Sequence, residues 1–460
     1  MVDRRDLETC LRVLAELRAA GDKHPDHAVI EREVAAFYKG GKKRRRVARE
    51  QARSARDRAR LEATARVMQT LSPEAASEPR STRDPESNEE YERARSCYVC
   101  KQPYRRVDTH YHMLCPVCAN RHKTERARRA DLTGRRALVT GGRIKIGFEL
   151  TRMLLRDGAA VTLITRFPQD AVRRFQALPE AATFGERLAI VGLDLRYLPA
   201  VVEFCSAWLA RGEALDILVN NAAQTVRRPP AYYRELAAGE RALISGRETA
   251  SPSADSRWLE AHNSGRGLLD HFHEQCLQDR DCDAFPIGLR TEEGLPLDLR
   301  ERNSWRLALA DVDTREMVEA QLVNAMAPFV LMGKLRPALE RSAFSPRFIV
   351  NVSAMEGKFD YRAKTSRHPH TNMAKAALNM LTRTSAADYA ESEIYVNSVD
   401  TGWITDENPE PLKLRLRENG FHPPLDVVDG AARIYAPILD GLAGKPYFGQ
   451  FLKDFSPTTW

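Results

Sequence analysis

The sequence predicts an α/β protein with a Rossmann-like, doubly wound parallel sheet, a small zinc-ribbon-like module and an α-helical N-terminal extension. Three observations lead to this prediction: a strand–turn–helix–strand pattern at 136–165, four cysteines at metal-ligand spacing within 97–118, and helical periodicity before residue 71. We expect four parts: a basic helical extension (1–71), a linker (72–92), a zinc-binding module (93–125) and a dinucleotide-binding domain (131–460).

The composition is that of a folded chain. It has 460 residues, of which 43% are hydrophobic, which is enough for a core in at least one domain. No run of eighteen apolar residues occurs, and the N-terminal MVDRRDLETC lacks the apolar core of a signal peptide. We therefore expect a cytoplasmic protein with no membrane partner.

Positive charge is concentrated at the front of the chain. Residues 1–130 hold 30 Lys and Arg against 20 Asp and Glu, a net charge of +10, and the remainder carries −2. Residues 5–38 predict one or two helices broken at 21–25, and the Arg- and Ala-rich stretch 40–71 predicts a solvated helix. No aromatic residues interleave the arginines to stack on bases, which argues against nucleic acid and leaves a protein partner as the alternative.

Four cysteines form the pattern C-x2-C-x14-C-x2-C. Two such pairs supply the tetrahedral sulfur ligands that Zn²⁺ prefers, and with all four ligands from protein the zinc would be structural. An iron–sulfur cluster, a redox pair and unliganded core thiols are the alternatives. Nearby histidines could replace a thiolate, although a core or surface role is favoured for each. The predicted ligands are Cys97, Cys100, Cys115 and Cys118, and the histidines are His110, His112 and His122.

A βαβ unit opens the large domain. Arg136–Thr140 and Ala160–Thr165 have the apolar pattern of strands, 148–157 has helical periodicity, and Gly158 ends the helix. The glycine-rich turn between the first strand and the helix is a phosphate site in such units, because glycines let backbone N–H groups approach and the helix N-terminus is partially positive.

This turn resembles the fingerprint T-G-x-x-x-G-x-G of the short-chain dehydrogenase/reductase family. Thr140, Gly141 and Gly147 match it, and Lys145 replaces the middle glycine. The lysine could close the turn or place its ammonium on the pyrophosphate. Further segments follow in the family's order, among them GLDLR, LVNNAAQ, LVNAMAPF, TNMAKAAL and YVNSVDTGWIT. The resemblance implies cofactor-binding roles for Thr140, Gly141, Arg143, Lys145, Ile146, Gly147, Arg166, Asp194, Leu195, Asn221, Ala222, Ala223, Lys375 and Thr405.

The end of the second strand indicates which cofactor binds. An acidic residue there would bind the 2′-hydroxyl of NAD and repel a phosphate, but the chain has Thr165 and Arg166. A guanidinium can form a bidentate pair with a 2′-phosphate, so NADP(H) is favoured over NAD(H).

Two of the family's four catalytic positions are altered. Thr371 stands where the family has its proton-donating tyrosine, and Ala354 where it has its serine, whereas Asn324 and Lys375 are retained. A threonine hydroxyl is too weak an acid to replace the tyrosine. Replacement groups are Ser353, one position early, and His368, which precedes Lys375 by the seven-residue spacing of enoyl reductases in the superfamily; Tyr361 and His370 lie in the same segment.

An insertion of about 226–314 separates Asn221 from Asn324 at the mouth of the expected site. Its aromatic residues and helical runs predict an ordered lid or partner surface. Arg227 and Arg228 would favour an anionic substrate, or could pair with the insertion's own acids. The resemblance implies an NADP(H)-dependent oxidoreductase acting on a carbonyl, hydroxyl or enoyl substrate, as a homodimer or homotetramer. The alternative is a non-catalytic NADP(H)-binding sensor or scaffold.

Overall fold

A nine-stranded sheet forms the centre of the protein in the computed structural model, which describes residues 3–21, 25–71, 89–248, 259–260, 282–291, 294–360 and 364–460. The strand order is β11-β10-β9-β8-β6-β3-β4-β5-β7, and all neighbours are parallel except β10 and β11. The strands are β3 (Arg136–Thr140), β4 (Ala160–Thr165), β5 (Leu188–Gly192), β6 (Ile217–Asn220), β7 (Leu259–Glu260), β8 (Arg347–Ser353), β9 (Ile394–Asp400), β10 (Phe451–Lys453) and β11 (Ser456–Thr458).

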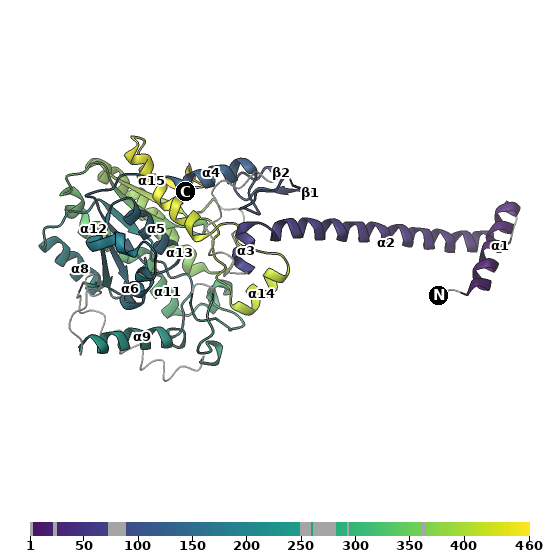
Figure 1. The fold of residues 1–460 in the computed structure, drawn as a ribbon, viewed down its shortest axis with the longest axis horizontal. Coiled ribbons are helices and arrows are strands. Elements are labelled where there is room, and N and C mark those ends of the chain that lie inside the picture. Colours follow the sequence, from purple (N-terminus) through teal and green to yellow (C-terminus); the bar gives the residue numbers. More distant parts are fainter. Residues whose placement is uncertain are drawn as a thin grey trace.

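Helices cover both faces of this sheet, which confirms the predicted doubly wound α/β class (Figure 1). One core packs the strands against α5 (Lys145–Arg156), α6 (Pro168–Gln176) and α15 (Val427–Leu442). The other packs them against α8 (Leu198–Ala210), α12 (Ala327–Glu340) and α13 (Pro369–Ala390). The remaining helices of this domain are α7 (Ala181–Phe184), α9 (Pro230–Glu248), α11 (Thr314–Gln321) and α14 (Glu410–Glu418).

The strand order reverses between β3 and β6. From β3 the chain winds outward through β4 and β5, then returns to β6 and winds the other way through β8 and β9. In open α/β sheets the crevice for a ligand lies outside the carboxyl ends of the strands at such a reversal. The glycine-rich turn follows β3 and the Asn-Asn-Ala-Ala segment begins at the end of β6, so both lie at this point.

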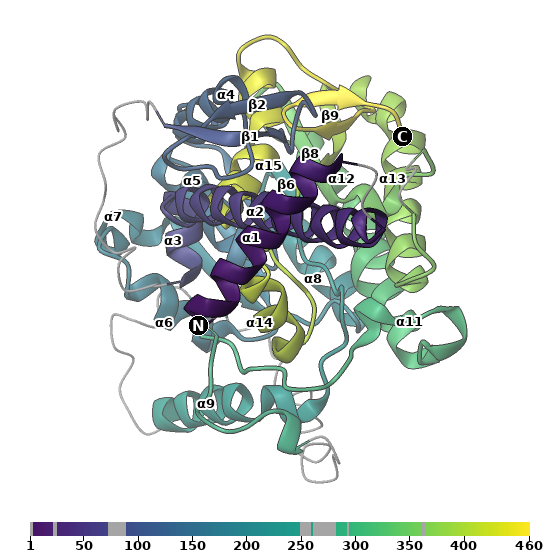
Figure 2. The ribbon, with the colours of Figure 1, turned by 90° about the vertical axis from the view of Figure 1, so that its right-hand side faces the viewer.

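The cysteine module consists of a hairpin and a helix. Its elements are β1 (Glu90–Ser96), β2 (Pro103–Arg106) and α4 (Pro116–Ala127), with β1 and β2 antiparallel. β1 begins inside the segment expected as linker, because its Glu92 and Arg93 N–H groups bind the Asp57 carboxylate of the preceding helix. The module and α9 lie at opposite ends of the body (Figure 2).

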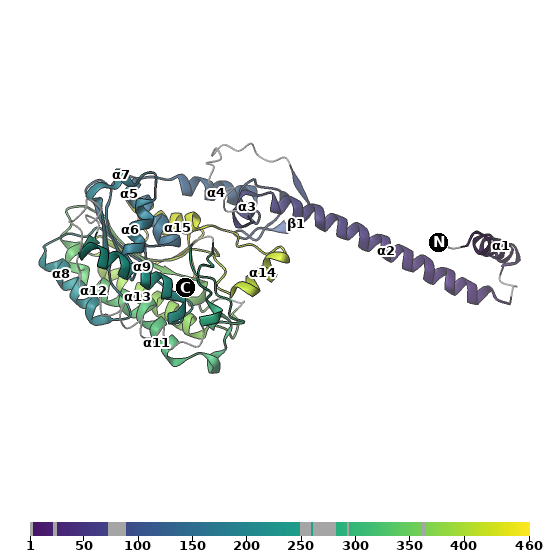
Figure 3. The ribbon, with the colours of Figure 1, turned by 60° about the horizontal axis from the view of Figure 1, so that its bottom comes forward.

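The N-terminal extension projects away from the body over its first two helices, and its third helix lies against the body (Figures 1 and 3). It comprises α1 (Arg4–Ala20), α2 (His27–Glu62) and α3 (Ala65–Leu71). The break near Gly21 is as predicted, but no helix boundary occurs near Gly40. Gly40 and Gly41 lie within the long α2, whose good helix formers continue on both sides. The buried residues of α2 are Asp57 and Leu61. The basic residues of α2 are therefore not among its buried residues, as the composition predicts.

Other boundaries shift by a few residues. Helix α5 begins at Lys145, three residues before the predicted start, because the turn itself supplies the first helical residues. The parts of the expected linker and insertion at 72–88, 249–258, 261–281 and 292–293 lie outside the described residues. Among the residues that are described, no helix has the length and apolar character needed to cross a bilayer.

Candidate active site

The glycine-rich turn is packed tightly against the loop after β6. Gly141 has a φ of 71°, and a Cβ there would lie 2.9 Å from the Cα of Ala222. A Cβ on Gly147 would lie 2.3 Å from the carbonyl oxygen of Gly141. Both positions therefore need glycine. They bring the N-terminus of α5, where backbone N–H groups have no helical partner, to the sheet edge at which a phosphate would bind.

Lys145 has the backbone conformation that the missing glycine would supply. Its φ is 56°, in the left-handed region that favours glycine. Its ammonium lies 3.7 Å from a carboxylate oxygen of Glu407, in the loop after β9. This ammonium lowers the pKa of Glu407 to about 2, despite the burial of the carboxylate. Lys145 thus preserves the turn and links it to the loop that carries Thr405.

Hydrogen bonds hold the turn to the Asn-Asn-Ala-Ala segment. The N–H groups of Asn221 and Ala222 both donate to Thr140 Oγ1 at 3.0 Å. The Asn221 side-chain amide donates to the carbonyl oxygens of Thr140 and Gly141, each at 3.1 Å. Asn220 donates to Asn351 of β8 at 2.8 Å. These contacts fix the end of β3 against β6 and β8.

Asn324 interrupts the helical run in which it lies. It lies in a π-helical turn, Leu322–Met326, between α11 and α12. Its side-chain oxygen accepts from the N–H of Gln224 at 2.7 Å, and its amide donates to the Gln224 carbonyl at 3.1 Å. A π-helical turn frees backbone groups that an α-helix would use, and such turns are frequent at functional sites.

Lys375 extends from α13 toward the end of β8. It is 6% exposed, and its Nζ donates to the carbonyl oxygen of Val352 at 2.7 Å. Burial lowers the pKa of Lys375 to about 8, although the nearby carboxylate of Glu356 raises it. The structure therefore places a cation of moderate acidity beside the strand that ends at Ser353.

Two family models match the chain on either side of the insertion. The one described as short chain dehydrogenase covers 135–238, and the one described as Enoyl-(Acyl carrier protein) reductase covers 303–414. A probable oxidoreductase of Streptomyces lividans is 40% identical over 151 residues. The chain belongs to the short-chain dehydrogenase/reductase family.

Other matches differ in how much they cover. An uncharacterized protein, R665, of Acanthamoeba polyphaga mimivirus is 29% identical over 75% of this chain and 71% of its own length. The Streptomyces match covers 31% of this chain and 49% of that relative. A solved short chain dehydrogenase from Burkholderia cenocepacia J2315 in complex with NADP has a TM-score of 0.45 and 20% identity, covering 70% of this chain and 97% of that one.

Thr371 and Ser353 are buried and Ala354 is half-buried, and the three positions are not equivalent. Ser353 ends β8; its hydroxyl is buried and has no hydrogen-bond partner in the described part of the chain. Thr371 lies in the first turn of α13 and donates its hydroxyl to the Thr225 carbonyl at 3.3 Å. Ala354 follows Ser353 and offers no polar side-chain group. Of the two hydroxyls, that of Thr371 is therefore the one with a hydrogen-bond partner among the described residues.

His368 lies at the N-terminus of α13 and is held by two neighbours. Its ring stacks on Trp305 of the insertion, with centroids 4.0 Å apart, and its Nδ1 lies 3.1 Å from Asn372 Oδ1. Burial lowers the pKa of His368 to about 4, so the ring is neutral at pH 7. His370 is buried, 3.8 Å from a Glu316 carboxylate oxygen, and Tyr361 lies outside the described residues.

Two arginines flank Phe167 where a 2′-phosphate would be expected. The Arg166 guanidinium is 5.5 Å from the ring centroid and Arg143 is 5.3 Å from it. Arg143 pairs with Asp170 at 2.5 Å, and Arg166 donates to the Tyr233 hydroxyl of α9 at 3.1 Å. The insertion thus contributes one wall beside the second strand.

Asp194, one of the expected cofactor-binding residues, makes an internal ion pair. It accepts from Arg196 at 2.5 Å. Burial raises the pKa of Asp194, but the hydrogen bonds and charge of Arg196, together with Arg166, outweigh burial and lower it. The carboxylate therefore stays ionised. Leu195, next to it, is 6% exposed and packs into the core beside α8.

The two arginines at the start of the insertion form ion pairs with nearby carboxylates. Arg228 pairs with Asp298 of the insertion and lies 3.7 Å from Glu407. Arg227 lies 3.3 Å from Glu319 of α11. The pairing of Arg228 with the insertion's own acid is the second of the two predicted alternatives, so Arg228 adds little charge for an anionic substrate.

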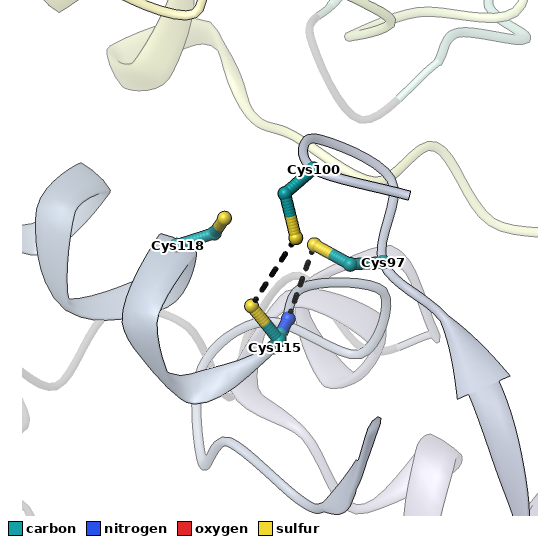
Figure 4. Close-up of side chains that lie close together, drawn as sticks. All are labelled: Cys97, Cys100, Cys115 and Cys118. Carbon is teal, nitrogen blue, oxygen red and sulfur yellow. Dashed lines mark hydrogen bonds between the residues drawn. The ribbon is translucent and has the colours of Figure 1, made fainter. Parts of the chain in front are cut away.

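The four cysteines converge (Figure 4). Their sulfurs all lie within 4.8 Å of one another, and the Cys100 and Cys115 sulfurs are 3.7 Å apart. Zn–S bonds of about 2.3 Å imply sulfurs roughly 3.8 Å apart in a tetrahedron, so the donor set fits zinc. Of the neighbouring histidines, His112 contacts the His422 carbonyl at 3.2 Å, and His110 and His122 lie within 3.8 Å of Asp426 and Asp429. These contacts give the histidines roles other than replacing a thiolate.

Sequence reasoning missed Glu407 and Glu240. Glu240 of α9 is buried and accepts from the N–H groups of Gln169 and Asp170 at the start of α6. Burial raises the pKa of Glu240 to about 7. The one sequence signal for Glu407 was Lys145, because a lysine in a glycine position suggests a nearby carboxylate. Glu407 is distant from Lys145 in the sequence, so the signal did not identify it.

Proposed function

We propose that this chain is an NADP(H)-dependent oxidoreductase that interconverts a carbonyl or enoyl compound with its reduced form. The observation that carries the proposal is the buried Lys375, adjacent to the strand end and on the same sheet edge as an intact glycine-rich turn. NADPH, when bound, supplies the hydride. The sequence-derived roles remain part of the proposal: the turn and Asn221 to Ala223 hold the dinucleotide, and Asn324, Lys375, Ser353 and His368 serve the reaction.

Within this proposal Lys375 is the proton source. A hydride added to a carbonyl leaves an alkoxide that needs a proton, and the donor should have a pKa near the working pH. Lys375, with a pKa lowered by burial to about 8, is largely protonated at pH 7. The neutral His368 cannot act as an imidazolium at that pH, and we assign it the task of holding the insertion on α13 through Trp305. Ser353 offers its hydroxyl to orient the substrate oxygen.

The non-catalytic alternative is tested with the same protein. Purified wild type is incubated with NADPH and a panel of ketones, aldehydes and enoyl thioesters, and NADPH consumption is followed at 340 nm. Turnover of at least one substrate supports the oxidoreductase. NADPH binding without turnover on any substrate would favour the sensor or scaffold, because Ala354 and the hydrogen-bonded hydroxyl of Thr371 remove two of the family's catalytic groups.

Arg166 should set the preference for NADP(H). Arg166→Ala is expected to weaken NADPH binding roughly ten- to a hundredfold, since one charge-assisted contact to the 2′-phosphate is lost, and to leave NADH binding unchanged. Dissociation constants for both cofactors, measured by fluorescence titration, check this. The matched control is Arg173→Ala. The Arg173 side chain lies in the same region, is 68% exposed and pairs with Asp170. Equal losses for NADPH and NADH would count against the assignment.

We also propose a homodimer through the helices that carry Asn324 and Lys375. Large apolar side chains are exposed along these elements, with Phe329 at 64% and Met380 at 58%, and Met326 and Met373 beside them. Contiguous exposed apolar surface commonly marks a protein interface. A protein partner for the basic N-terminal helices is a separate proposal, supported only by their charge and projection from the body.

The double variant Phe329→Glu with Met380→Glu is expected to yield monomers, because two carboxylates would have to be buried against the partner. Light scattering at several protein concentrations measures the mass. Leu414→Glu, at a residue of α14 that is 51% exposed, is the control and should keep the wild-type mass. A wild type that is monomeric at all concentrations would exclude the dimer.

A further inference from the structure

The first cysteine pair lies directly over the loop that follows β9. Tyr98 stands between Cys97 and Cys100, and its hydroxyl oxygen accepts the backbone N–H of Trp403 at 2.9 Å. Trp403 belongs to the loop of residues 401–408, which we call the cofactor loop because it contains Thr405 and Glu407. One turn of the cysteine module is thus hydrogen-bonded to a backbone group of the proposed active site.

An apolar core joins the same two parts. Ile404 of the cofactor loop and Leu425 after it are 5% and 0% exposed, and they pack in one cluster with module residues. Ile146 of the glycine-rich turn borders that cluster. The module residues of the cluster are Tyr91, Cys97, Tyr104, Val107, Tyr111 and Leu114 among others. The interior of the module is therefore continuous with the underside of the cofactor loop.

Buried polar contacts fix the module in this position. Tyr111 donates to Asp429 of α15 at 2.5 Å, and Arg126 of α4 lies 2.6 Å from Asp426 at the start of α15. Asp426 and Asp429 also form the capping box of α15. Separating the module would leave these buried carboxylates without their partners, which is costly.

The cofactor loop in turn holds the glycine-rich turn. Thr405 donates to Glu407 at 2.9 Å, and Glu407 pairs with Lys145. From the opposite side, Arg433 of α15 donates to the Thr401 carbonyl at 2.7 Å. Contacts therefore run from the cysteines through Tyr98 and Trp403 to Glu407 and Lys145.

We propose that a zinc ion held by Cys97, Cys100, Cys115 and Cys118 positions the cofactor loop, so that zinc occupancy controls the affinity for NADP(H). This rests on the proposed function. The four sulfurs join the turn that carries Tyr98 to the start of α4, and the binding energy of a structural zinc is folding energy for a small unit of this kind. Loss of the metal releases Tyr98 from Trp403 and uncovers Ile404.

The test compares NADPH affinity with metal content in the full chain. Zinc is measured by elemental analysis, removed with a chelator and then restored with zinc chloride, and NADPH binding is titrated by fluorescence at each stage. We expect the stripped protein to bind NADPH at least tenfold more weakly and zinc to restore the affinity. Unchanged affinity on stripping, or purified protein that neither contains nor takes up zinc, overturns the inference.

Removing the Tyr98 hydroxyl tests the contact between the cysteine module and the cofactor loop without changing a zinc ligand. Tyr98→Phe keeps the ring and the four cysteines, and we expect normal zinc content with NADPH affinity lowered roughly three- to tenfold, the effect of one lost hydrogen bond. Tyr104→Phe is the matched control: its hydroxyl donates to the His112 carbonyl inside the module, so affinity should stay at the wild-type value. Equal behaviour of the two variants overturns the inference. Wild type that holds zinc but binds neither nicotinamide dinucleotide refutes the proposed function itself.

Discussion

Replacing Lys375 with methionine is expected to reduce NADPH-dependent turnover by about a thousandfold. Methionine keeps the length and apolar stem of the side chain but removes the ammonium that supplies the proton, and positioned acids contribute roughly 10²–10⁴-fold to such reactions. Loss of the contact between the Lys375 ammonium and the cofactor should also weaken NADPH binding by about tenfold. Initial rates and fluorescence titrations separate the two effects.

A lysine elsewhere controls for the loss of charge. Lys334→Met removes an exposed lysine from α12 and should leave both rate and affinity unaffected. The wild-type reduction rate should also fall as the pH rises through about 8, because the ammonium of Lys375, whose pKa burial lowers to about that value, then loses its proton. Residual turnover of Lys375→Met above one-tenth of wild type would mean that another group donates the proton.

The substitution Gly147→Ala is expected to abolish cofactor binding. The added methyl group would lie 2.3 Å from the Gly141 carbonyl oxygen and 2.5 Å from the Asn221 amide nitrogen, so α5 must move away from the turn. Because the phosphate site depends on that close approach, we expect NADPH affinity to fall by more than a hundredfold. Overpacking of this kind also costs about 1–3 kcal/mol of folding stability.

Gly239→Ala provides the comparison for this variant. Gly239 lies in α9, and the described residues place no atom within 4 Å of the position that its methyl group would take. Alanine there should leave NADPH binding intact and favour the helix by up to about 1 kcal/mol. Circular dichroism and thermal melting show whether Gly147→Ala remains folded. A folded Gly147→Ala protein that binds NADPH normally would show that the dinucleotide does not lie on this turn.

The order of local motifs was sufficient to predict the family. Residues such as Thr140, Gly141 and Gly147 reveal themselves locally because a tight turn before a helix restricts which residues fit, and the family models and the sheet topology confirm both membership and fold class. The cysteine spacing predicted their convergence in the same way, because two short loops each direct two sulfurs to one point.

What the local pattern left open was settled by contacts between distant segments. The sequence allowed two roles for Lys145, and only the fold shows Glu407 opposite its ammonium. It offered His368 as a proton donor, and only packing against Trp305 reveals a ring that is neutral at pH 7. Ion pairs and burial depend on contacts between side chains that are distant in the sequence. The periodicity of the sequence does not predict those contacts.

The sequence by itself therefore determined the α/β class, the glycine-rich turn and the four-cysteine set, because backbone geometry and ligand chemistry impose local residue requirements. Tertiary structure alone decided that the cysteine module packs on the cofactor loop and that Tyr233 of the insertion contacts Arg166. Those arrangements arise from the shared burial of surfaces far apart in the chain, which is a property of the whole fold.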